Sequence, residues 1–171
     1  MPMLQIVING FAQPQRAPQG AIVPPLPPGL RNRHHVQMHT PAEVRRWQVF
    51  AKHEASEQMK GKNLYLGALG VIIKVYLPVP SSMSQKKTAQ ALAGQLAPTT
   101  RPDLDNYCKS VLDALSGVVW VDDSQVVELH MAKLYSEKPR VEITVSEMGA
   151  AKAVEWVDQP TLFRDHDKGF T

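Results

Sequence analysis

The chain has 171 residues, a hydrophobic fraction of 43% and a formal net charge of +3, which suits one domain with a core and leaves little room for a second. Its one cysteine, Cys108, excludes an internal disulfide and the zinc sites that need several thiolates. The basic balance permits nucleic-acid binding. No apolar run approaches the roughly 20 residues that span a bilayer and the N-terminus does not resemble a secretory signal, so we expect a cytoplasmic protein with no membrane partner.

The first third of the chain predicts a strand, a proline-rich loop and a helix. Leu4 to Ile8 alternates apolar and polar residues, as a half-buried strand does. The six prolines between Gln13 and Gly29 exclude a helix or an interior strand, so this region is expected to be an extended loop. The run Thr40-Pro41-Ala42-Glu43 is typical of a helix start with a capping box, and Gly61 is typical of a helix stop.

The middle of the chain predicts a central strand followed by two helical segments. Leu64 to Leu77 is rich in β-branched and aliphatic residues, which favours a long buried strand. Ser81 to Gln95, with Ser84 as a candidate cap, predicts a short helix or an ordered loop. An amphipathic helix is expected from Asp103 to about Leu115, where Gly117 ends it.

The last predicted elements are two strands. Val126 to Tyr135 and Arg140 to Glu147 both alternate apolar and polar residues, and a Ser-Glu-Lys-Pro segment separates them. This pattern favours an antiparallel hairpin. The residues from 150 onward are polar with scattered aromatic side chains, and are expected to be a docked appendage or a partly disordered tail.

The acidic residues between Asp103 and Asp123 carry most of the chemistry that the sequence offers. Asp103 lies two residues before Asp105 at the entrance of the expected helix, and Asp105, Lys109 and Asp113 follow one another at i, i+4 and i+8 on one polar stripe. A second acidic pair ends at Asp123, after the predicted break in the helix. If the chain folds back at this break, three or four carboxylates converge.

Converging carboxylates repel one another unless a cation neutralises them. Mg²⁺ suits such hard oxygen ligands and keeps waters or phosphate oxygens in its shell. It can polarise a phosphodiester and activate water, and a nearby lysine can stabilise the developing negative charge. The same residues also have a structural explanation, because aspartates commonly cap helices and Asp-Asp-Ser is common turn material.

The combined string resembles the RusA family of Holliday-junction resolvases. The resemblance covers residues 99 to 149 closely and is looser upstream. The residues that carry it are Arg101-Pro102-Asp103-Leu104-Asp105-Asn106, Lys109, Leu112-Asp113-Ala114-Leu115, Trp120-Val121-Asp122-Asp123-Ser124-Gln125-Val126-Val127, Lys133 and Glu147-Met148-Gly149.

The resemblance implies a mixed α/β fold, in which helices flank a mixed sheet in a single compact nuclease domain over residues 1–149, followed by the tail 150–171. It also implies a homodimer that resolves four-way DNA junctions by paired symmetric nicks, using Mg²⁺ with Mn²⁺ as a substitute. By match, Asp103, Asp105 and Asp123 are the catalytic metal-binding acids and Lys109 is the catalytic lysine. Asp122 is an additional candidate metal ligand.

Charge and position suggest a set of phosphate contacts: Lys86, Lys87, Arg101, Lys133 and Arg16. Two other functions stay open beside the resolvase. One is a junction-binding protein without catalysis, and the other is a broader nuclease that cuts flaps or other branched DNA.

Four further residues are expected to have no role in chemistry. Cys108 falls on the apolar stripe of the expected helix, which predicts a core position. His34, His35 and His39 form a loose cluster, but no carboxylate or thiol lies at a suitable spacing for a metal site. A solvated loop is the interpretation that we favour for these histidines.

Overall fold

The computed structural model of this protein describes residues 3–16, 19–22 and 36–148. A four-stranded mixed sheet lies at its centre, with the strand order β1-β6-β4-β5. These strands are β1 (Leu4–Asn9), β4 (Leu69–Pro78), β5 (Val126–Ser136) and β6 (Arg140–Glu147). The helices of the described part are α1 (Ala42–Gln58), α2 (Gln85–Leu92), α3 (Leu104–Leu115) and the single 3₁₀ turn η1 (Asp123–Gln125). The expected mixed α/β fold is confirmed.

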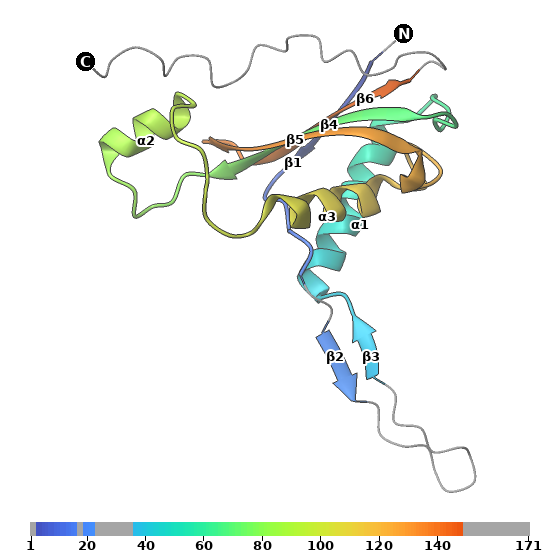
Figure 1. Ribbon diagram of the computed structural model, residues 1–171, viewed down its shortest axis with the longest axis horizontal. Helices are drawn as coiled ribbons and strands as arrows, with labels where there is room; N and C mark the ends of the chain where they lie inside the picture. The colour runs from blue at the N-terminus through green and yellow to red at the C-terminus, as the bar shows by residue number, and fades with distance from the viewer. Residues whose placement is uncertain (1–2, 17–18, 23–35, 149–171) are drawn as a thin grey trace, which may run out of the picture.

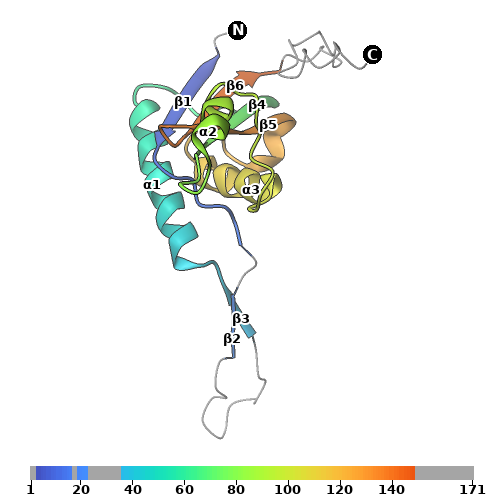
Figure 2. The ribbon, with the colours of Figure 1, turned by 90° about the vertical axis from the view of Figure 1, so that its left-hand side faces the viewer.

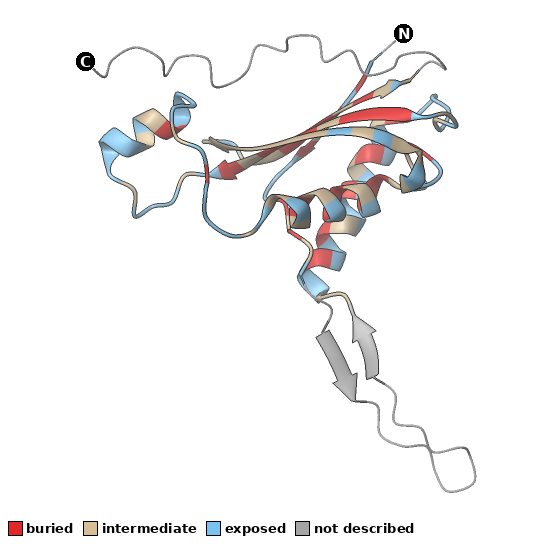
Figure 3. Ribbon diagram, in the orientation of Figure 1, coloured by how far each residue is buried: buried red, intermediate tan, exposed pale blue. Residues whose placement is uncertain are grey.

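One face of the sheet is apolar and is covered by α1 and α3 (Figure 1, Figure 3). Successive strand residues point to opposite faces, so the alternating sequences place every second side chain in this layer. The buried strand residues are Leu4, Ile6, Ile8, Leu69, Val71, Ile73, Val75, Leu77, Val141, Ile143 and Val145. They share one core cluster with Trp47 of α1 and Val111 of α3, which fixes α3 against the sheet.

The predicted hairpin between the last two strands is wrong. β4 lies between them, parallel to β5 and antiparallel to β6, so that Val71 is in register with both Leu129 and Val145. The alternation of apolar residues reports which face of a strand is buried and does not identify the neighbour that it pairs with. β4 presents the long aliphatic run, and it therefore occupies the more buried interior position.

The expected extended loop contains a strand. β2 (Gln19–Ile22) pairs with β3 (Val36–His39) in a separate antiparallel two-stranded sheet, which projects away from the main sheet as an arm (Figure 1, Figure 2). Gln19–Ile22 is a proline-free stretch between Pro18 and Pro24, so its backbone amides are able to pair. Residues 17–18 and 23–35, which include most of the proline-rich region together with His34 and His35, lie outside the described residues, as do residues 149–171 with the predicted tail 150–171.

Two boundaries differ from the expectation. β4 begins at Leu69 and not at Leu64, because the preceding residues form a connection in which the amide of Tyr65 donates to the carbonyl of Val119 at 2.9 Å. The capping box expected at Thr40 is absent, because Pro41 occupies the cap position of α1 and no side-chain cap bond forms there. Ser84 is the cap residue of α2, as expected, also without a side-chain hydrogen bond.

In the described part of the chain, no helix is both long and apolar enough to cross a membrane.

Two adjacent isoleucines of β4 provide a test of this one-sided core. Ile73 is fully buried on the helix-covered face, whereas Ile72 is half-buried on the other face. Ile73→Ala should lower the free energy of unfolding by about 2–5 kcal/mol through lost burial and a residual cavity, and Ile72→Ala by under about 2 kcal/mol. Urea unfolding measures both. Equal losses would contradict the assignment of a single covered face.

Candidate active site

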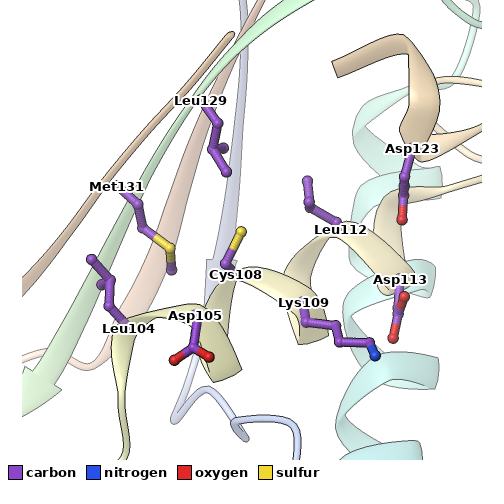
Figure 4. Close-up of a pocket in the computed structure, with 9 residues that line it drawn as sticks. All are labelled: Leu104, Asp105, Cys108, Lys109, Leu112, Asp113, Asp123, Leu129 and Met131. Atoms are coloured by element: carbon purple, nitrogen blue, oxygen red, sulfur yellow. The ribbon is translucent and has the colours of Figure 1, made fainter. Parts of the chain in front are cut away.

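An open cleft lies between α3 and the strand β5, with η1 at one end (Figure 4). One side of α3 is buried against the sheet and α1, and this fixes which side chains it turns toward the cleft. The polar residues that line the cleft are Asp105, Lys109, Asp113 and Asp123. The apolar lining residues are Leu104, Cys108, Leu112, Leu129 and Met131.

The cleft brings together three of the four predicted catalytic residues: Asp105, Lys109 and Asp123. Figure 4 shows Lys109 extending toward Asp113, with Asp105 on the other side of Cys108 along the helix. In the described residues Lys109 forms no ion pair, so its ammonium is free for a ligand. Asp113, which belongs to the polar stripe of the sequence, lines the cleft in addition to the predicted site residues.

Asp103 is the cap residue of α3, but its side chain makes no cap hydrogen bond. It is exposed and does not belong to the residues that line the cleft. Asp103 thus occupies the cap position that the structural explanation assigns to it, but without the side-chain hydrogen bond of a cap. Among the described residues its carboxylate forms no cap hydrogen bond and no ion pair at the entrance of the helix, two residues before Asp105.

The expected convergence of three or four carboxylates does not occur in the described part of the chain, where no three histidine, cysteine or acidic side chains gather closely enough to hold a metal. Asp105 and Asp113 are separated by two helical turns, which is about 12 Å of helix rise. Mg²⁺ binds through one or two carboxylates and completes its shell with waters and substrate phosphates. The described residues therefore form no site in which protein ligands alone enclose an ion.

The two members of the second acidic pair have different surroundings. The Asp122 carboxylate accepts a hydrogen bond from the amide of Ser124 at 2.9 Å and caps η1. Hydrogen bonding from the hydroxyl and then from the amide of Ser124 lowers the pKa of Asp122. The Asp123 carboxylate instead faces the cleft and accepts a hydrogen bond from the indole of Trp120 at 2.9 Å. The turn explanation thus fits Asp122, and the site explanation fits Asp123.

The amide side chain of Gln125 fastens this acidic turn to the rest of the fold. Its Nε2 donates to the carbonyls of Tyr65 and Gly67, both at 3.0 Å. Its Oε1 accepts from the amides of Val121 and Asp122 at 2.8 and 3.0 Å. In the sequence, Gln125 is one member of the string that resembles the RusA family. A single sequence does not indicate that its side chain forms hydrogen bonds with the distant Tyr65 and Gly67.

Lys133, a predicted phosphate contact, is engaged within the protein. Its ammonium donates to the carbonyls of Thr100 and Pro102 at 3.1 and 2.9 Å, and so it ties β5 to the segment just before Asp103. Its role toward DNA stays a prediction. Of the other predicted phosphate contacts, Lys86, Lys87 and Arg101 are exposed, and exposed Arg16 lies 3.9 Å from Glu43.

Cys108 was expected in the core, but it is half-buried and lines the cleft. The expectation failed because the apolar stripe of α3 is divided: Val111 and Leu115 pack in the core, while the cysteine falls at the edge that faces β5. Partial burial raises the pKa of the Cys108 thiol, and the negative charges of Asp105 and Asp123 raise it further.

The RusA endodeoxyribonuclease family model matches residues 20–146 of this chain. The chain belongs to the RusA family. It is 38% identical over 152 residues to the uncharacterized protein YqaN of Bacillus subtilis (strain 168), a match that covers 88% of this chain and 100% of that protein.

Two phage proteins named crossover junction endodeoxyribonuclease rusA match a shorter part of the chain. The protein of Lactococcus phage r1t is 43% identical over 51 residues, and that of Enterobacteria phage 82 is 45% identical over 51 residues. Each match covers 29% of this chain, and 39% and 42% of the two phage proteins respectively. The family of the chain therefore agrees with the resemblance drawn from its sequence.

Replacing Lys133 by methionine distinguishes a tether from a phosphate contact in this RusA-family site. If the ammonium mainly holds the segment before Asp103, Lys133→Met should lower the free energy of unfolding by about 1–3 kcal/mol, since two carbonyls lose a charged donor. The affinity for DNA should change little. Lys74→Met, at an exposed position of β4, is the matched control. Unchanged stability together with weaker DNA binding would contradict the tether.

The single thiol reports on two of the acids of the cleft, Asp105 and Asp123. Because the pKa of Cys108 is raised and the thiolate is the reactive form, alkylation by iodoacetamide should be slow at neutral pH and should accelerate only well above the pH at which a free cysteine reacts. Asp105→Asn or Asp123→Asn should lower this pKa and speed the reaction, and Asp122→Asn should not. Identical pH profiles for all variants would place the thiol away from the carboxylates.

Proposed function

We propose that this protein is a Mg²⁺-dependent endonuclease that resolves four-way DNA junctions by paired symmetric nicks. The observation that carries the proposal is the cleft in which Asp105, Lys109 and Asp123 lie together, within the stretch that resembles the RusA family most closely. The family match and the names of the two phage relatives support a nuclease acting on crossover junctions.

In this proposal the acids of the cleft hold the cation and Lys109 binds the phosphate. Asp105 and Asp123 supply the carboxylates in the cleft. Asp103 lies outside the cleft lining, at the entrance of α3, and its proposed role as a ligand comes from the resemblance to the RusA family. A bound Mg²⁺, or Mn²⁺ in its place, would polarise the phosphodiester and activate water. The unpaired ammonium of Lys109 then neutralises charge on the phosphate oxygens. The apolar residues that line the cleft, among them Leu112, Leu129 and Met131, lower the local dielectric constant. A lower dielectric constant strengthens these charge interactions.

We propose in addition that two copies of the chain act together. Two symmetric cuts require two active sites, and a homodimer with two-fold symmetry supplies both from one gene product. Contacts to phosphates rather than to bases would recognise the shape of the branch. The exposed Lys86, Lys87 and Arg101 are our candidates for these contacts.

The two alternative functions make different predictions with the same reagents. A junction-binding protein without catalysis would bind a four-way junction and leave it intact with either Mg²⁺ or Mn²⁺. A broader nuclease would cut flaps and junctions at similar rates. Comparing initial rates on a junction, a flap and a linear duplex of the same sequence therefore separates the three functions.

The acidic pair provides the sharpest mutational test. Asp123→Asn should reduce cleavage of a labelled four-way junction by at least about 100-fold, the order of loss seen when one electrostatic contact to the reacting group is removed. Asp103→Asn should behave likewise. Binding to the junction should persist or improve, because a negative charge near phosphate is lost. A gel assay with Mg²⁺ and with EDTA measures cleavage, and a shift assay measures binding.

Asp122→Asn is the matched control. Asparagine also accepts a hydrogen bond at a cap position, so η1 should persist and cleavage should stay within a few-fold of the wild type. If a folded wild-type protein binds junctions but never nicks them with Mg²⁺ or Mn²⁺, the endonuclease proposal is wrong. If Asp122→Asn inactivates the protein as fully as Asp123→Asn does, the different roles of the pair are wrong.

A further inference from the structure

We propose that Trp120 is a positioning residue for Asp123, and that its indole N–H sets the direction in which this carboxylate meets a cation. This inference rests on the proposed function, because it assigns a role to a residue next to the proposed metal ligand. Trp120 itself does not line the cleft. Trp120 acts through Asp123 and is therefore a positioning residue and not a catalytic one.

The contact is a hydrogen bond between a buried donor and a cleft-lining acceptor. Nε1 of Trp120 donates to Oδ1 of Asp123 at 2.9 Å. In the described residues, Oδ2 of Asp123 has no protein donor. One carboxylate oxygen is thus engaged by the protein, and the other stays available to a cation or to its bound water.

The donor is held rigidly. Trp120 has 0% exposure and is among the largest fully buried side chains. Its carbonyl accepts from the amide of Gly117 at 2.7 Å, and its backbone forms bridges with Tyr65 and Ser116. Gly117 has a φ of 73°, a conformation that favours glycine. Since the indole cannot follow a moving carboxylate, Asp123 must turn toward the indole to keep the bond.

Another tryptophan of the same core shows that burial alone does not create this bond. Trp47 is 7% exposed, and its indole nitrogen has no hydrogen-bond partner in the described residues. Trp47 thus fills the core without orienting an acid, and it serves as a natural control for Trp120. Both changes to phenylalanine remove the same atoms from the same hydrophobic cluster, but only one of them removes a donor to the cleft.

The experiment compares Trp120→Phe with Trp47→Phe in the full-length chain. Electron paramagnetic resonance of free Mn²⁺ measures the affinity for the cation without any DNA or turnover. Loss of a hydrogen bond that orients a metal ligand typically weakens metal binding by about 10–100-fold. We therefore expect Trp120→Phe to weaken Mn²⁺ binding about tenfold or more, and Trp47→Phe to leave it within about twofold.

A second measurement needs no metal. The chain has three tryptophans, so its ¹H–¹⁵N spectrum contains at most three indole signals, which the two substitutions assign. Asp123→Asn should shift the Trp120 signal and leave the Trp47 signal in place, because only the former donates to that carboxylate. This readout uses a core with both tryptophans intact. If Trp120→Phe fails to fold, Trp47→Phe and Trp156→Phe assign the remaining indole signal to Trp120 by elimination.

The outcomes separate this inference from the proposed function. If the wild type binds no Mn²⁺, the metal-dependent function and the positioning role are both wrong. If the wild type binds Mn²⁺ and a folded Trp120→Phe binds it equally well, only the positioning role is wrong. An unmoved Trp120 indole signal in Asp123→Asn would likewise refute the contact and leave the nuclease proposal standing.

Discussion

The site depends on how the acidic turn before β5 is fastened to the fold. The side-chain amide of Gln125 uses both of its donors and its acceptor oxygen to join this turn to the carbonyls of Tyr65 and Gly67. An amide with every partner in place fixes the backbone on both sides of it. The turn therefore has a set position before any ligand arrives, and Asp123 is presented to the cleft from a rigid base.

The same strand also fastens the other acidic segment. Lys133 of β5 holds the carbonyls just before Asp103, while the acidic turn leads directly into β5 at Val126. Both acid-bearing segments are thus tied to one edge strand of the sheet, and the packing of α3 sets the space between them.

The part of this design that lies in local sequence could be predicted. The periodicity from Asp103 to Leu115 and the glycine at 117 define α3 correctly. Of the residues in the family string, the fold brings Asp105, Lys109 and Asp123 to one cleft, and it leaves Asp103 and Asp122 outside the cleft lining. The strand neighbours of β5 could not be predicted, because alternation does not specify a partner. The tether formed by Lys133 and the bond from Trp120 were also missed, since both connect groups whose proximity arises only from tertiary packing.

The central claim is that the cleft between α3 and β5 binds the catalytic cation through Asp123. Anomalous diffraction from crystals grown with Mn²⁺ locates the ion directly. The account predicts an Mn²⁺ peak in the cleft, coordinated by the Asp123 oxygen that Trp120 does not occupy, with water or phosphate in the rest of its shell. A peak bound elsewhere on the protein, with the cleft empty at saturating Mn²⁺, would contradict it.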